Sequence, residues 1–454
     1  KRRTSPLLAI LVVGATVGLA SAARADGGIP GSLAILLPAD QPRKVGLATT
    51  FGLILSEDAG ATWLWTCEQA ATTSMANVYA VGPSAIASAG VGDRFYALSP
   101  LEGLAWSDDE SCTWQTAAGL PAGAAVSDFF VDPSDPAHVL AVVVAPSDGG
   151  VAGAGEVLAS SDGGRTFGAA PLYRAAAGAT IVGVEIARSN PRVVYVATYT
   201  TTATGPAPVL SRSADAGGSW TSTPLASVGA AIVRILAVDP QDSDVIYLRV
   251  LAAAGDAVAV ARNGGATVAV PVTFARGQLS AFARLSSGTI LVGALIFTDA
   301  GGTDGAAVRS TDGGSSFQPW TLPDRPHLVG LAERVENGRP RLYLSAKNYS
   351  DGWALAVSDD EGATLTKLMT YDQVKGAKPC VHQICEDTCK FENMQGIWDL
   401  SVCTGTAGGG SGGGGGGSGC GCGIDPTTVG ATRLAEAASA LVCLLALRRR
   451  RRRT

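Results

Sequence analysis

The sequence predicts an all-β protein: a single seven-bladed β-propeller with four antiparallel strands per blade, followed by a small disulfide-rich cap and a flexible tail. Three observations support this fold class. One eight-residue pattern, here called the octet, occurs seven times, with successive starts 51, 53, 53, 48, 49 and 48 residues apart. Short runs of β-branched and aromatic residues, typical of strands, flank the copies. Apolar residues at helical spacing are nearly absent. A period of about 40–50 residues is characteristic of propellers and solenoids.

The octet reads small-x-Asp-x-Gly-x-Thr/Ser-aromatic, and each position has a reason in a tight turn. Asp accepts hydrogen bonds from the backbone that follows it, and Gly adopts a positive φ without steric cost. The Thr and the aromatic residue then begin a new strand. Each octet is therefore predicted to be the turn of a β-hairpin. The copies are 56–63, 107–114, 160–167, 213–220, 310–317 and 358–365, with a degenerate copy at 261–268 (ARNGGATV).

These positions are predicted to be structural, because turn formation accounts for every one of them. The alternative, an array of aspartates that binds calcium or another ligand, is disfavoured. The turn residues are Asp58, Gly60, Trp63, Asp109, Trp114, Asp162, Gly164, Phe167, Asp215, Gly217, Trp220, Asn263, Gly265, Asp312, Gly314, Phe317, Asp360 and Gly362.

The octets resemble the Asp-box, or BNR, repeat (SxDxGxTW) of sialidases, sortilin-type receptors and photosystem II assembly-factor propellers. The resemblance implies that each octet joins the third and fourth strands of a blade, on the outer rim of the ring. Pro/Asp turns such as 131–139 (VDPSDPAHV) recur upstream of the octets and supply an earlier turn of the same unit.

Residues 1–25 are predicted to be a secretory signal peptide. Three basic residues at 1–3 precede an apolar run at 7–20, and Ala23-Arg24-Ala25 matches an Ala-x-Ala cleavage site. The mature chain is expected to begin near Asp26 and to be exported.

The propeller is predicted to occupy residues 26–375, with seven similar units from Ser32 to about Lys375. Each unit supplies two apolar strands ahead of its octet. These pairs are 32–37 and 44–49, 78–81 and 94–98, 128–131 and 139–144, 181–186 and 193–197, 232–238 and 245–250, 279–285 and 289–292, and 328–332 and 341–345.

Three segments rich in Gly, Thr, Ala and Asp, at 147–156, 200–208 and 298–307, are predicted to be long loops on one face of the ring. Loops on a rigid scaffold often carry binding residues. Asp299 and Asp304 could hold a cation there, but their spacing matches no calcium loop. They are therefore predicted to be solvated.

Six cysteines are predicted to form disulfides, as expected in an exported protein. Cys67 and Cys112 are expected to pair and to join the first blade to the second. In a Cys-rich cap at 376–404, Cys380, Cys385, Cys389 and Cys403 can form two further bridges in any of three pairings. A metal site that includes His382 is the alternative, but the spacing fits no zinc or haem template. No metal and no cofactor are predicted.

The end of the chain combines a Gly/Ser linker at 405–423, which contains Cys420 and Cys422, with an apolar segment and a run of six consecutive arginines within 424–454. This arrangement resembles the myxobacterial C-terminal sorting signal (MYXO-CTERM). The resemblance implies cleavage near Cys420 or Cys422, lipid attachment, and display at the cell surface or outer membrane. The apolar run of eleven residues is shorter than the roughly 20 that span a bilayer. The alternative is a plain flexible tail with a basic end.

Charge and missing motifs exclude several functions. Between the predicted signal peptide and the basic tail, the chain carries 23 Lys and Arg against 38 Asp and Glu. This negative balance argues against binding of nucleic acid. The sialidase Arg-Ile-Pro motif is absent, and the nearest string is Val233-Arg234-Ile235-Leu236, in a predicted core strand. A single propeller also cannot reproduce the two-propeller xyloglucan hydrolases, which take one catalytic Asp from each propeller. With three histidines, no nucleophile motif and no phosphate loop, no catalytic residue is assigned.

The predicted function is therefore that of an exported, surface-anchored, monomeric binding, adhesion or scaffold module whose ligand, glycan or protein, is unknown. The alternative is a divergent sialidase-like glycoside hydrolase. An assembly factor like the photosystem II propellers is a third class, disfavoured because the sorting tail places this protein outside the cell.

Overall fold

The computed structural model describes residues 30–38, 41–72, 78–81, 94–99, 102–144, 155–336 and 338–404. All of them belong to one compact unit that ends at Ala407. The predicted signal peptide and most of the loop at 147–156 lie outside the described residues. So do the predicted linker and sorting tail, with Cys420 and Cys422.

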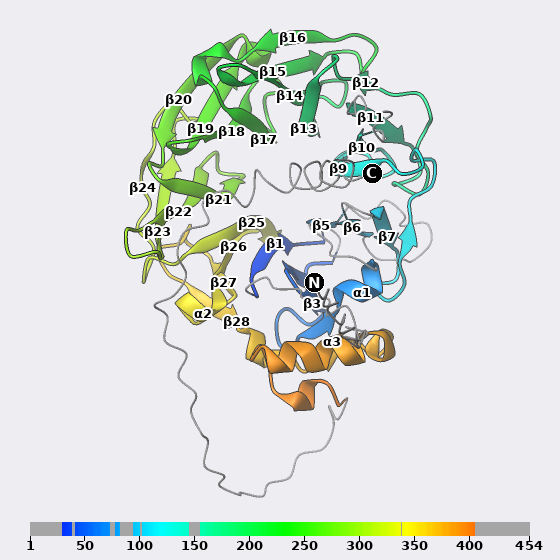
Figure 1. Cartoon of the computed structure of the whole chain (residues 1–454). Coiled ribbons are helices and arrows are strands. Elements are labelled where there is room, and N and C mark those ends of the chain that lie inside the picture. Colours follow the sequence, from blue (N-terminus) through cyan, green and yellow to red (C-terminus); the bar gives the residue numbers. More distant parts are fainter. Residues whose placement is uncertain are drawn as a thin grey trace, which may run out of the picture. The chain divides into compact units, whose positions relative to one another are not determined.

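Seven antiparallel four-stranded sheets form the blades of a β-propeller (Figure 1), which confirms the predicted fold class. Each blade consists of four consecutive strands. Blades 1 to 3 are β1 (Ser32–Leu36), β2 (Val45–Thr49), β3 (Gly52–Ser56) and β4 (Leu64–Thr66); β5 (Val78–Val81), β6 (Phe95–Ser99), β7 (Gly103–Ser107) and β8 (Gln115–Thr116); β9 (Ala125–Val131), β10 (Val139–Val144), β11 (Gly155–Ser160) and β12 (Tyr173–Arg174).

The remaining four blades follow the same order along the chain. They are β13 (Ala179–Ile186), β14 (Val194–Thr202), β15 (Gly205–Ser213) and β16 (Thr221–Pro224); β17 (Ile232–Val238), β18 (Ile246–Ala252), β19 (Gly255–Arg262) and β20 (Thr267–Thr273); β21 (Gly277–Arg284), β22 (Ile290–Phe297), β23 (Thr303–Ser310) and β24 (Gln318–Pro319); β25 (Leu328–Glu336), β26 (Arg339–Ala346), β27 (Leu355–Ser358) and β28 (Thr366–Met369). In every blade the octet lies between the third and fourth strands.

The hydrophobic core lies between neighbouring blades. Tyr195 and Leu210 of blade 4, for example, pack in one cluster with Ile246 and Leu248 of blade 5. A strand with a neighbouring blade on each face is buried on both faces, which explains continuous apolar runs such as β10 (VLAVVV). The short outer strands β8 and β24 are exposed.

The first strand of each blade lies nearest the centre of the ring (Figure 1), and six of these strands share an irregularity. Each has a one-residue register shift against the second strand of its blade. Such bulges increase the local twist of a strand and change the direction of nearby side chains. The six strands are β1, β9, β13, β17, β21 and β25.

Two of the predicted long loops are shorter than predicted, because strand pairing extends into them. The pairing of β14 with β15 continues to Thr202 and Gly205, which leaves a two-residue tip instead of a loop over 200–208. The pairing of β22 with β23 continues to Phe297 and Thr303, which leaves residues 298–302 as the turn. The prediction was wrong because Thr-rich and Ala-rich segments extend these hairpins as strand.

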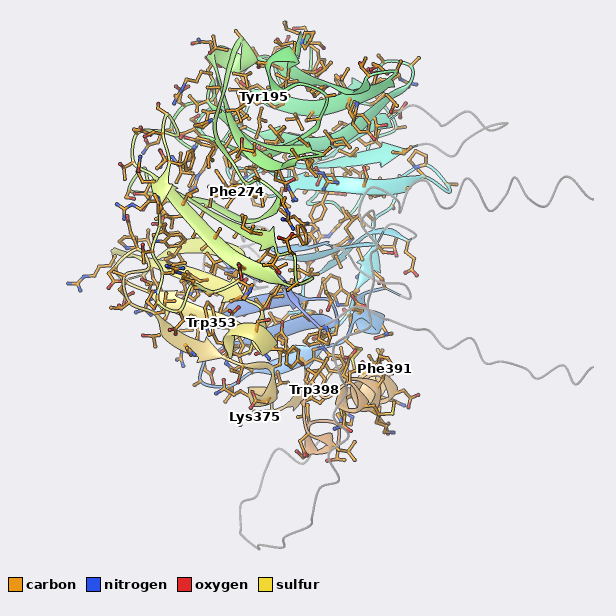
Figure 2. The ribbon with its side chains drawn as sticks, turned by 60° about the vertical axis from the view of Figure 1, so that its left-hand side comes forward. Tyr195, Phe274, Trp353, Lys375, Phe391 and Trp398 are labelled. Carbon is orange, nitrogen blue, oxygen red and sulfur yellow. A yellow bond between two sulfur atoms is a disulfide. The ribbon has the colours of Figure 1, made fainter. Side chains whose placement is uncertain are left out.

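The chain returns to blade 1 after the seventh blade. The strand β29 (Gly376–Ala377) pairs in parallel with β4, and the short helix η3 (Tyr371–Gln373) precedes it. The helix α3 (His382–Met394) and the short helix η4 (Leu400–Val402) follow, at the periphery of the ring next to blade 1 (Figures 1 and 2). Among the described helices, none has the length and hydropathy needed to cross a membrane.

The disulfides are Cys67–Cys385, Cys112–Cys380 and Cys389–Cys403. All six predicted cysteines are therefore bonded, but the predicted Cys67–Cys112 bridge is wrong. The C-terminal segment runs beside both outer cysteines, and each of them pairs with this segment instead. Only one bridge lies within the predicted cap. Because its four cysteines are oxidised, they cannot serve as ligands of the metal site considered as an alternative.

Candidate functional site

The octet aspartates are fully used in building their turns. In the octet at 160–167, Asp162 Oδ1 accepts from the Ser160 hydroxyl at 2.7 Å and from the Thr166 N–H at 2.9 Å. Its Oδ2 accepts from the Thr166 hydroxyl at 2.6 Å. Gly163 and Gly164 have φ of 73° and 77°, the left-handed conformation that such a turn requires.

Each octet that begins with Ser is held by four hydrogen bonds of this kind. The carboxylate of the third residue accepts from the hydroxyl of the first residue and from the N–H and the hydroxyl of the seventh residue. The N–H of the fifth residue donates to the hydroxyl of the first residue. The bonds of these turns are made around Asp58, Asp109, Asp162, Asp215, Asp312 and Asp360. Within the described residues, no group of three or more metal-ligating side chains occurs.

Hydrogen bonding also keeps these carboxylates ionised. The hydroxyl and then the N–H of Thr62 lower the pKa of Asp58 to about 2. The hydroxyl and then the N–H of Ser219 lower the pKa of Asp215 to about 2. These aspartates therefore act as anionic turn formers.

The degenerate octet folds differently. Ala261 supplies no hydroxyl, and Asn263 itself adopts a φ of 53°, followed by Gly264 and Gly265 at 66° and 100°. The Asn263 amide makes one long contact with the Thr267 hydroxyl, at 3.5 Å. The loss of the first Ser thus removes the pattern that organises the other six turns.

Two carboxyl groups on neighbouring inner strands have raised pKa values. Asp128 of β9 accepts the Val184 N–H of blade 4 at 3.2 Å, and Glu185 of β13 accepts the Val238 N–H of blade 5 at 2.7 Å. Burial raises the pKa of Asp128 to about 6. Burial, together with the nearby Asp128, raises the pKa of Glu185 to about 8. A neutral carboxyl beside a partly ionised one is an arrangement that can serve acid–base chemistry.

Sequence reasoning missed this pair, because many acids in the chain could qualify equally well. The only signal was a single acid within each apolar run, AVSDFFV and ATIVGVEI. Arg234, expected in a core strand, lies in β17 of the next blade with an exposed side chain. Its positive charge acts against the rise in the pKa of Asp128.

A second cluster lies where blades 6 and 7 meet, at the end of the sheets where the second and third strands connect. His327 Nδ1 is 2.8 Å from Asp351 Oδ1, and His327 Nε2 is 2.7 Å from the Thr303 carbonyl oxygen. Lys347 Nζ donates to the Thr303 hydroxyl at 3.0 Å. Burial lowers the pKa of Lys347.

Two exposed aromatic residues lie on the elements that form this cluster, and the ring of one of them, Tyr349, packs edge to face on Tyr371 with centroids 5.9 Å apart. Phe297 ends β22 and is 49% exposed, and Tyr349 lies in the helix α2 (Asn348–Asp351) of blade 7 and is 54% exposed. Nearby, Asp299 pairs with Arg276 at 2.7 Å and Asp304 is exposed in β23.

A shallow pocket of about 260 Å³ also lies between blades 6 and 7, beside the octet at 358–365. Arg309, Asp360 and Glu361 line it, with Trp320 at one wall. Trp320 Nε1 donates to the Glu361 carbonyl oxygen at 2.9 Å, so this side chain already contributes to the packing of the two blades against each other.

These features define the class of the protein as a seven-bladed β-propeller with octet turns and a disulfide-linked C-terminal segment. Among solved structures it is similar to an ancestral GH74 enzyme, at 14% identity and a TM-score of 0.51, over 74% of this chain and 46% of that one. It also matches a GH74 xyloglucanase from Xanthomonas campestris (14% identity, 76% and 58% coverage, TM-score 0.38) and YCF48 bound to D1 peptide (17%, 56% and 73%, 0.34).

At these identities the similarity shows the fold alone. The chain spans about half the length of the ancestral GH74 enzyme. No family model matches the sequence, and no curated protein does.

Proposed function

We propose that this chain is an exported propeller, displayed at the cell surface, that binds a glycan or a protein without transforming it. The observation that carries this proposal is the polar cluster of blades 6 and 7, with two exposed aromatic residues, Phe297 and Tyr349, on the elements that form it. Rigid aromatic side chains next to fixed hydrogen-bonding groups are typical of recognition surfaces.

Strand register relates Phe297 to the polar cluster. Phe297 is the register partner of Thr303, so both side chains project from the same face of the sheet. The Thr303 hydroxyl accepts from Lys347, the residue that precedes α2. Phe297 therefore projects toward the blade that carries Tyr349.

The polar groups of the cluster are held in place before any ligand arrives. Asp351 accepts from the backbone N–H groups of His327 and Lys347, each at 3.1 Å, in addition to facing the imidazole. Such preorganisation reduces the entropy lost on binding.

Export is supported by the three disulfides, which are typical of oxidising compartments. The predicted signal peptide and the MYXO-CTERM-like tail also support export and display at the cell surface. The octets support membership of the Asp-box group of propellers. Anchoring through Cys420 or Cys422 is part of this proposal.

The competing function is glycoside hydrolysis, and one observation favours it: the raised pKa values of Asp128 and Glu185 on adjacent inner strands. Glycosidases use two carboxyl groups in such distinct protonation states. Both side chains here, however, bind backbone N–H groups of the next blade, which is a sufficient structural role.

The test is a glycan and peptide array probed with residues 26–407, together with a fluorogenic sialidase and glycosidase panel. Saturable binding that is lost in Phe297→Ala/Tyr349→Ala, and kept in the control Val270→Ala on the exposed strand β20, would support the proposal. Turnover that is abolished by Glu185→Gln would replace it with the hydrolase. Unchanged binding in the double variant would show that the binding site lies elsewhere on the protein.

A further inference from the structure

In the described residues, the two ends of the propeller are joined by one short strand pairing. Blade 1 is β1 to β4 and blade 7 is β25 to β28, and the two-residue strand β29, which follows blade 7, pairs in parallel with β4 of blade 1. Their direct hydrogen bonds include Arg334 Nη1 to the Lys44 carbonyl oxygen at 2.7 Å and Nη2 to the Pro42 carbonyl oxygen at 2.6 Å. Because β29 has only two residues, closure of the ring must depend on further contacts besides this sheet pairing.

Residues 370–403, here called the clasp, connect three blades at this point. The clasp leaves blade 7 at β28 and adds β29 to β4, where Lys375 N–H donates to the Trp63 carbonyl oxygen at 2.9 Å. It is then bonded by Cys380 to Cys112, in the octet of blade 2, and by Cys385 to Cys67, at the end of β4.

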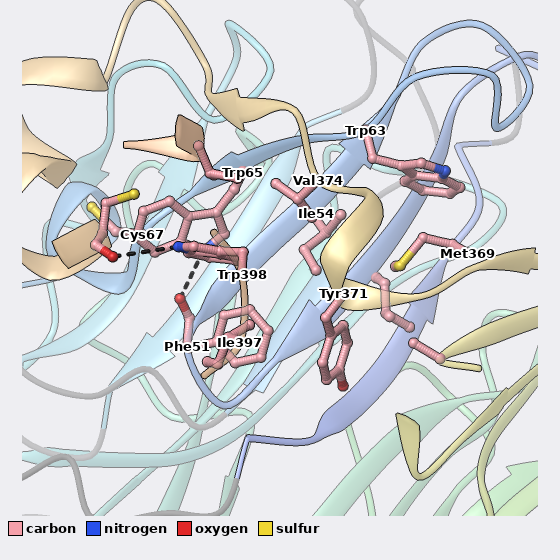
Figure 3. Close-up of a cluster of buried hydrophobic side chains, with 14 of the residues drawn as sticks. Phe51, Ile54, Trp63, Trp65, Cys67, Met369, Tyr371, Val374, Ile397 and Trp398 are labelled. Carbon is pink, nitrogen blue, oxygen red and sulfur yellow. Dashed lines mark hydrogen bonds between the residues drawn. The ribbon is translucent and has the colours of Figure 1, made fainter. Parts of the chain in front are cut away.

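The clasp also completes a hydrophobic core on blade 1 (Figure 3). The rings of Trp398 and Trp65 have centroids 4.9 Å apart, and those of Tyr371 and Phe51 are 5.1 Å apart. Val374 and Ile397 are buried in the same cluster.

A buried cation strengthens the same junction. Lys378 Nζ donates to Glu57 Oε1 at 3.1 Å and to the Glu110 carbonyl oxygen at 3.0 Å. Glu57 belongs to the octet of blade 1, and Glu110 to that of blade 2. One side chain of the clasp thus bridges two blades.

The two interblade disulfides differ in access to solvent. Cys380 is exposed and Cys112 is partly exposed, whereas Cys67 and Cys385 are 1% and 0% exposed. Thiol–disulfide exchange requires access of the attacking thiolate to a sulfur atom. Cys112–Cys380 is therefore the bond that a small reductant reaches first.

We propose that the clasp is a redox-sensitive lock on the ring. A small dithiol supplies two electrons and two protons to Cys112–Cys380, which becomes two thiols while the dithiol becomes a cyclic disulfide. Loss of this bond loosens the clasp and exposes Cys67–Cys385, which is reduced in the same way. Blades 1, 2 and 7 then open at their junction, while blades on the opposite side of the ring remain folded.

The long separations of the bonded residues explain why the lock is effective. The two bridges join residues 318 and 268 positions apart, so each constrains nearly the whole length of the propeller in the unfolded chain. Cys389–Cys403 spans 14 positions within the clasp. It provides a matched control that changes the disulfide count without releasing a blade.

The test is hydrogen exchange on the intact oxidised protein during titration with dithiothreitol, with free thiols counted by alkylation and mass spectrometry. We expect Cys112 and Cys380 to be alkylated first. Once Cys67–Cys385 is reduced, we expect exchange at least tenfold faster in β1 to β4 and β25 to β28, with β13 to β16 unchanged.

Variants separate the lock from general stability. A variant without both interblade bridges, Cys67→Ser/Cys112→Ser/Cys380→Ser/Cys385→Ser, should reproduce the faster exchange in blades 1 and 7 without reductant, and Cys389→Ser/Cys403→Ser should alter exchange only within the clasp. If the first variant does not fold, the titration of the native protein still decides the matter. Unchanged exchange in blades 1 and 7 after full reduction, or an equal rise in all seven blades, would overturn the proposal.

Discussion

Trp65 of the first blade and Trp398 near the end of the described chain pack edge to face, with ring centroids 4.9 Å apart and planes at 64° (Figure 3). Trp65 Nε1 donates to the Phe51 carbonyl oxygen at 2.9 Å, which fixes the ring that Trp398 contacts. The two rings belong to the two ends of the propeller, so their contact reports directly on how the ring is closed.

Trp398→Ala is expected to destabilise the protein by about 3–5 kcal/mol, because it opens a cavity in this buried cluster. Urea denaturation followed by tryptophan fluorescence and circular dichroism measures the change. Leu400→Ala, two residues away and 49% exposed, is the control and should change stability by less than about 0.5 kcal/mol. Similar losses in both variants would show that the cluster does not contribute specifically.

Asp162→Ala should cost about 1–3 kcal/mol, since it removes the acceptor of three hydrogen bonds in one turn and leaves the Thr166 N–H without its partner. The measurement is the shift of the thermal unfolding midpoint. Asp304→Ala, which removes an exposed aspartate in β23, should have little effect. A null result for Asp162 would mean that the glycines alone are enough to form the turn.

Acid should destabilise the fold in a defined window. The octet aspartates have lowered pKa values in the folded state, so the unfolded chain binds more protons. Their contribution is complete above the ordinary value of 3.8 and is lost as the pH falls toward about 2. Urea midpoints measured between pH 6 and pH 2.5 should drop steeply below about pH 4. A flat profile there would contradict the assigned turn chemistry.

The titration of Glu185 should change the stability of the fold with pH in the opposite direction. Its folded pKa is raised to about 8 from 4.5, so its neutral form is favoured in the native state and stability is lost as the pH rises through this range. Glu185→Gln keeps an oxygen that can accept the Val238 N–H and removes the titration. Compared with the wild type, this variant should gain at least about 1 kcal/mol in stability between pH 5 and pH 8. Parallel stability profiles for the two proteins would refute the raised pKa.

The fold class and the octet turns were predictable because their physics is local. The bonds of each turn join residues two to four positions apart, as between Ser160 and Asp162 or Asp162 and Thr166, so the pattern of residues reveals the geometry. The near-constant spacing of the seven copies then predicts the number of blades. The different fold of the copy at 261–268 can also be predicted from the sequence, because this copy lacks the first Ser.

Only the tertiary structure decided the cysteine pairing and the candidate sites. Cys67 and Cys112 bond to residues that approach them because the C-terminal segment returns to blade 1, and no spacing in the sequence encodes that return. Asp128 and Glu185 become distinctive only when the closed ring brings each carboxyl to a backbone N–H of the next blade. Thr303 of blade 6 meets His327 and Lys347 of blade 7 because the two blades pack side by side. Contacts between residues distant in sequence depend on how the whole ring closes, which local patterns do not determine.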